Sequence, residues 1–168
     1  RTLPPLFLPR SPLVVVLGQV RFSPILMMES YIPAIQDELR RSGFPGFRKG
    51  VVDEVTWSFA QNASAEPAVE TVKRPRWEFS SVDSSWRIVL TEDALTIATS
   101  EYVQYEEPFE RFMRTALTAV DTSAALQVVT RLGLRYVDLV QASPGKSLGE
   151  YLHANLLGVP AEKLGMRE

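Results

Sequence analysis

The sequence predicts an α+β domain: a twisted antiparallel sheet with amphipathic helices on one face. Two observations predict this class. Three short alternating segments lie between residues 77 and 99, and strands joined by such tight turns are antiparallel. Two other segments, over residues 31–42 and 106–121, have apolar residues at helical spacing and need a sheet face to bury against. The expected element order is β-α-β-β-β-β-α-β-α.

Length and composition indicate one globular domain. The chain has 168 residues, 18 basic against 20 acidic side chains and a net charge of −2, which suits a domain that forms its own core. It has no cysteine and one histidine, which excludes disulfides, thiol catalysis and cysteine-bound zinc, so we expect no metal and no cofactor. No apolar run approaches the roughly 18 residues of a membrane span. We therefore expect a cytoplasmic protein with no membrane partner.

The N-terminal third of the chain is expected to form a lead-in, a strand and a helix. Residues 1–12 are rich in proline and predict an extended segment. Leu13–Leu17 is apolar and predicts a buried strand that continues to Phe22, where Val20 and Phe22 alternate with polar residues, and Gly18 indicates a bulge or bend. Ser30 is a suitable N-cap for the helix over residues 31–42.

The remaining elements follow from alternation and helical spacing. Val51–Phe59 alternates like a strand, and the three strands of residues 77–99 come next. The helix over 106–121 has one continuous apolar face, and acidic residues gather near its positive end. Ala125–Val140 predicts a long strand, and Ser147 is expected to cap a last helix. The expected organisation is a lead-in over 1–12, a domain over 13–142, and a helix and tail over 143–168 that begin a missing segment.

Four short segments carry a family resemblance. The first is Pro12-Leu13 with the run from Gln19 to Leu26, and the second is the W-x-F-x-S segment at Trp77–Ser81 with Asp83, Trp86 and the run from Leu90 to Ile97. The third is Tyr102 with Phe109 and Phe112, and the fourth is the run Arg131–Asp138, which contains the R-x-G-L-R-Y segment. Together they resemble a sporadically distributed family of uncharacterised bacterial proteins. The resemblance covers most of residues 12–142 and implies no particular activity. It implies longer members, and a distribution similar to that of accessory genes on mobile elements.

Arginines form the most specific candidate site in the sequence. Arg131 and Arg135 lie four apart on a predicted strand and therefore share a face, with Gly133 leaving room between them. Two such guanidinium groups suit a carboxylate, a phosphate or an acidic side chain of a partner. The alternative is that each arginine pairs with a cross-strand acid such as Glu78. The predicted binding face carries Arg76, Arg87, Arg131 and Arg135.

The leading functional hypothesis is a non-enzymatic binding domain that recognises a protein partner or its own copy. It rests on the arginine face and on the lack of catalytic motifs: the sequence has no nucleophile elbow and no phosphate-binding loop. The first alternative is an enzyme or small-ligand binder with a pocket between sheet and helices. Its polar groups would be Tyr102, Tyr136 and His153. A core filled by tryptophans 57, 77 and 86 would count against such a pocket.

The second alternative is nucleic-acid binding on the sheet face. It is disfavoured because Trp77, Phe79 and Trp86 alternate out of phase with the arginines and so point into the core. A negative net charge is also unlike the basic footprint of most nucleic-acid binders.

Overall fold

The computed structural model describes residues 12–58, 68–153 and 156. The chain divides into two compact units: Val15–Tyr136 form one, and the second lies within residues 1–14 and 137–168. Among the described residues, no helix combines the length and the apolar character that a membrane crossing requires.

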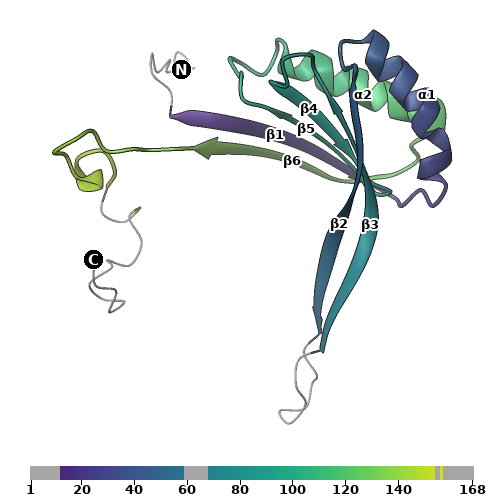
Figure 1. Ribbon diagram of the computed structural model, residues 1–168, viewed down its shortest axis with the longest axis horizontal. Coiled ribbons are helices and arrows are strands. Elements are labelled where there is room, and N and C mark those ends of the chain that lie inside the picture. Colours follow the sequence, from purple (N-terminus) through teal and green to yellow (C-terminus); the bar gives the residue numbers. More distant parts are fainter. Residues whose placement is uncertain (1–11, 59–67, 154–155, 157–168) are drawn as a thin grey trace, which may run out of the picture. The chain divides into compact units, whose positions relative to one another are not determined.

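Six strands form one antiparallel sheet, as the sequence predicts (Figure 1). Their order across the sheet is β2-β3-β4-β5-β1-β6. The predicted three-strand meander is confirmed, because β4 pairs with β3 on one side and with β5 on the other. The strands are β1 (Leu13–Phe22), β2 (Gly46–Ser58), β3 (Ala68–Ser80), β4 (Trp86–Leu90), β5 (Ala94–Thr99) and β6 (Val129–Asp138).

Two helices, α1 (Met28–Arg41) and α2 (Phe109–Ala124), lie on the same side of the sheet (Figure 1). The prediction of Ser30 as the N-cap of the first helix is wrong, because Met27 occupies that position. The helix begins earlier because fully buried Met28 adds one more turn to its apolar stripe. Ser30 lies inside the first turn, and its hydroxyl donates to the carbonyl of Met27 at 2.7 Å.

The second helix begins and ends three residues later than the sequence predicts. It ends where Ala125 adopts a left-handed conformation with φ of 50°. Ala125 is therefore the helix C-cap, and the last strand begins only at Val129.

Aromatic side chains fill the space between α2 and the middle of the sheet. Phe112 packs edge-on against Phe44 and Trp86, with ring centroids 5.3 and 4.8 Å apart. Trp77 and Trp86 are both buried. The side chain of Trp57, which the sequence also assigns to the core, lies outside the described residues.

Gly18 has a packing role, and the bulge predicted there is absent from the pairing of β1 with β5. These two strands pair without interruption from Val16 to Arg21. A Cβ atom at Gly18 would lie 2.6 Å from Cε of Met113 and 2.9 Å from Cζ of Phe109. Glycine therefore occupies this position because two side chains of α2 fill the space above it.

The predicted last helix is wrong over the described residues. Only one 3-10 turn forms there, Leu148–Glu150. The backbone N–H of Ser147 donates to the carboxylate of Glu150 at 3.1 Å, so Ser147 does cap this turn. Tyr151 is the C-cap of this turn, Leu152 and His153 do not continue it as a helix, and most of the remaining tail lies outside the described residues.

Candidate functional site: an arginine-rich face of the sheet

The two faces of the sheet differ in what covers them. In β4, Trp86, Ile88 and Leu90 are buried toward the helices, and Arg87 points to the opposite face. Both described α-helices pack on the first of these faces (Figure 1). We call the other one the open face.

Three arginines converge on one carboxylate on the open face. Glu78 in β3 lies directly across from Arg48 in β2, and Nη2 of Arg48 donates to both of its carboxylate oxygens, at 3.0 and 3.1 Å. Nη2 of Arg76 donates to Oε2 of Glu78 at 2.7 Å. Nε of Arg87, from β4, lies 3.3 Å from Oε1 of Glu78. We call Arg48, Arg76 and Arg87 the arginine cluster.

Glu78 is buried although no described helix covers it, with 8% of its surface exposed. The guanidinium groups around it exclude solvent. Burial raises the pKa of Glu78, but the hydrogen bond from Arg48 and the charges of Arg87 and Arg48 outweigh it, so the net pKa is lowered. Glu78 is thus a buried anion that holds three cations in place. Its own single charge leaves the cluster with an excess of positive charge.

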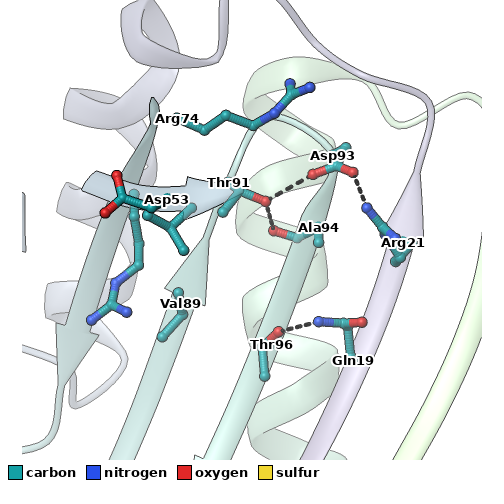
Figure 2. A pocket seen from close by; sticks show the side chains of 11 residues that line it. Gln19, Arg21, Asp53, Arg74, Val89, Thr91, Asp93, Ala94 and Thr96 are labelled. Carbon is teal, nitrogen blue, oxygen red and sulfur yellow. Dashed lines mark hydrogen bonds and ion pairs between the residues drawn. The ribbon is translucent and has the colours of Figure 1, made fainter. Parts of the chain in front are cut away.

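A pocket of about 410 Å³ lies next to the cluster on the open face (Figure 2). Arg76 belongs to both, so pocket and cluster form one continuous surface. Val52, Val89 and Ala94 provide its apolar part. Its polar residues are Gln19, Arg21, Asp53, Arg74, Arg76, Thr91, Asp93 and Thr96.

Most polar groups of the pocket are already paired with one another. The side-chain amide of Gln19 donates to the hydroxyl of Thr96 at 3.0 Å (Figure 2). Asp93 accepts hydrogen bonds from Arg21 and from Thr91. Burial raises the pKa of Asp93, but these two donors outweigh it and the net pKa is lowered.

Charge on the open face is unevenly matched. Arg21 is paired with Asp93, and Arg74 lies 3.5 Å from the carboxylate of Glu92, so these two cations each have their own anion. The arginine cluster has three cations on one anion. Positive charge therefore accumulates at the cluster rather than in the pocket.

The structure brings together two of the four arginines that the sequence proposes. Arg76 and Arg87 meet at Glu78, whereas Arg131 and Arg135 lie on β6, which β5 and β1 separate from β4. In the described part of the chain, Arg131 and Arg135 make no salt bridge, so the suggested pairing of these two with Glu78 is wrong. Both side chains are exposed at the sheet edge.

Arg48 is the cluster member that sequence reasoning missed. It lies just before the predicted strand Val51–Phe59, but β2 begins at Gly46, five residues earlier than predicted. Phe47-Arg48-Lys49-Gly50 shows no apolar–polar alternation that would extend the predicted strand to Arg48. The cross-strand register that pairs it with Glu78 is not visible in the sequence.

The pocket tyrosines proposed from the sequence do meet. The hydroxyls of Tyr102 and Tyr136 are 3.1 Å apart, and their rings pack edge to face. Burial raises the pKa of Tyr102, and the hydrogen bond with Tyr136 raises it further. His153 belongs to the other compact unit. The tyrosine pair is therefore a hydrogen-bonded contact between β6 and the loop that precedes α2.

Metal binding and known relatives give no further assignment. Within residues 12–58, 68–153 and 156, no group of three or more histidines or carboxylates is placed to hold a metal ion. No family model, curated protein or solved structure matches the chain. The resemblance to a sporadically distributed bacterial family thus stays a prediction.

Proposed function

We propose that this chain is a non-enzymatic binding domain that recognises an acidic surface of a protein partner through its open face. The observation that carries the proposal is the arginine cluster held by buried Glu78. Arg48 and Arg87 are more than half exposed, so their remaining N–H groups face solvent. A guanidinium group has five donors in a fixed plane, which suits paired hydrogen bonds to a carboxylate.

Glu78 also prepares the cluster for binding. An arginine side chain loses rotamer freedom when it binds a partner, and this loss weakens association. Contacts with Glu78 restrict Arg48, Arg76 and Arg87 before any partner arrives. Arginine is also among the residues that most often dominate the free energy of protein interfaces.

A protein partner is favoured over single-stranded nucleic acid because the described side chains of the open face form no aromatic stacking surface. Proteins that bind single strands combine positive charge with exposed aromatic rings. No aromatic residue lines the open-face pocket, and Trp77 and Trp86 are buried on the helix side. The pocket combines three apolar residues with a larger set of polar ones, a mixture that also occurs in protein interfaces.

The test is quantitative affinity capture of binding partners from the native host. It compares wild-type protein with a variant in which two arginines are replaced by uncharged glutamine. Arg48→Gln combined with Arg87→Gln removes two exposed charges and leaves Arg76 paired with Glu78. We expect a stoichiometric protein partner with wild-type protein, and an affinity at least about tenfold lower with the variant, equivalent to about 1.4 kcal/mol.

The matched control is Arg40→Gln with Arg41→Gln, which removes the same charge from exposed positions at the end of α1. This variant should capture the partner as well as wild type does. If both variants lost the same affinity for the partner, the change in net charge alone would explain the effect, which would contradict the proposal. Retention by the open-face variant, or recovery of nucleic acid in place of protein, would contradict the proposal.

A further inference from the structure

β6 is an edge strand whose side chains are exposed along its length. Three apolar residues follow one another at alternate positions on it: Leu132, Leu134 and Tyr136, with 74%, 45% and 48% of their surface exposed. Alternate residues of a strand share a face, so these three form one apolar row. Edge strands usually carry a proline, a bulge or charged side chains that discourage pairing, and the charges of β6 are Arg131, Arg135 and Asp138. β6 contains no proline.

The space between this strand and α2 is hollow and largely apolar. A hollow of about 440 Å³ is lined by Phe109, Met113 and Leu117 of the helix and by Leu132 and Leu134 of the strand. A second, of about 500 Å³, adjoins it, because Met113 and Leu117 line both. The helix and the edge strand thus border one continuous groove, which is apolar in the first hollow and also carries Glu110, Arg114 and Asp121 in the second.

We propose that β6 pairs antiparallel with β6 of a second copy of this chain, forming a symmetric dimer with one continuous sheet. The proposal is independent of the open-face function. Pairing would satisfy the outward N–H and C=O groups of the edge. It would also bring the apolar row of each copy beside that of the other, where both are now exposed to water.

The argument for a second copy is that the strand complements itself. A two-fold axis perpendicular to the sheet at Leu134 places Leu134 opposite its own equivalent and Leu132 opposite Tyr136 of the second copy. It also places Arg135 opposite Gly133, which has no side chain and has open space around its Cα. An apolar residue then faces an apolar one, and no arginine faces another arginine.

The neighbouring symmetric pairing does not have this property. An axis at Gly133 places Arg131 opposite Arg135 of the second copy, and like charges directly opposite each other destabilise a strand pair. Repulsion of this kind selects one pairing over the other. The two arginines therefore exclude an axis at Gly133, and only an axis at Leu134 places every residue of the apolar row opposite another member of that row.

Sedimentation velocity over a series of protein concentrations tests the dimer. We expect wild-type protein to change from monomer to dimer as its concentration rises. Leu134→Arg places two like charges on the axis and should weaken the dimer more than about tenfold. The control is Leu26→Arg, the same substitution at a leucine that is 83% exposed outside the strands. It should leave the dimer unchanged.

Gly133→Asp tests the pairing itself. With the axis at Leu134, each new aspartate faces Arg135 of the other copy, so the dimer should become roughly threefold to tenfold tighter. A Cβ at Gly133 meets no atom within 4 Å, so the variant should fold. The control is Gly50→Asp, because Gly50 lies on the opposite edge strand with equal space. Wild-type protein that stays monomeric at every concentration, or a dimer weakened by Gly133→Asp, would overturn the proposal.

Discussion

The carboxylate of Glu78 lies directly across the sheet from Arg48 and accepts two hydrogen bonds from it, at 3.0 and 3.1 Å. This pair anchors the arginine cluster, because Arg76 and Arg87 reach the same carboxylate. A buried anion with three cationic partners has a role both in stability and in the proposed binding. The two roles can be separated by substitution.

Replacing Glu78 with glutamine should destabilise the fold. The variant leaves three neighbouring guanidinium groups with no anion, and because Arg48 and Arg87 are more than half exposed we expect the cost of an unsatisfied hydrogen-bonding group, about 1–3 kcal/mol. Urea denaturation measures the free energy of unfolding. Glu29→Gln is the control, since Glu29 is an exposed partner of Lys49, and it should change stability by less than about 0.5 kcal/mol. Equal stability of wild type and Glu78→Gln would contradict the structural role.

Stability should also fall on acidification in a way that depends on Glu78. Its pKa is lowered in the folded state from an ordinary value of 4.5, so the unfolded chain binds its proton first as pH falls. The stabilisation is complete above 4.5 and is lost as pH drops through the lower folded-state pKa. The free energy of unfolding, measured by denaturation at a series of acidic pH values, should therefore fall less steeply with decreasing pH for Glu78→Gln than for wild type. Parallel slopes would contradict the lowered pKa.

Gly18→Ala should destabilise the protein through the core. The added methyl group would lie 2.6 Å from Met113 and 2.9 Å from Phe109. Met113 has a flexible end that can move, but the ring of Phe109 is buried and has little room. We expect a loss of about 1–3 kcal/mol in the free energy of unfolding, typical of overpacking. Gly50→Ala is the control, because its Cβ would meet nothing within 4 Å. Unchanged stability of Gly18→Ala would show that α2 can shift.

Much of the fold could be predicted from local patterns. The meander and the two helices follow from alternation and helical spacing over short windows, which the structure confirms. The sequence around Gly18 does not show why this residue is a glycine. The reason is its packing against α2, which lies about ninety residues further along the chain. A single sequence does not show such contacts between distant segments.

Predicting the candidate site also requires knowing which distant segments of the chain lie side by side. Arg76 and Arg87 could be assigned to the open face by alternation, and the structure places both there. Arg131 and Arg135 were grouped with them because strand order was unknown, whereas β6 lies beyond β5 and β1. The spacing of residues along a strand predicts which face they share, and only the order of strands determines which of them meet.

Arg131→Glu combined with Arg135→Glu should leave stability almost unchanged. Neither arginine makes a salt bridge within the described residues, and both are exposed on β6. Exposed charges without partners usually alter the free energy of unfolding by less than about 0.5 kcal/mol. Thermal unfolding measures this directly. A large decrease in the melting temperature would show that these arginines have a structural role.

The most direct test of the central claim is an NMR titration of the arginine side chains with the captured partner. The Nε–H signals of Arg48, Arg76 and Arg87 report on the cluster, and those of Arg40 and Arg41 report on α1, on the other side of the sheet. Binding through the open face predicts that the cluster signals shift in proportion to bound partner while the α1 signals stay in place. Shifts confined to α1, or cluster signals unchanged at saturation, would contradict the account.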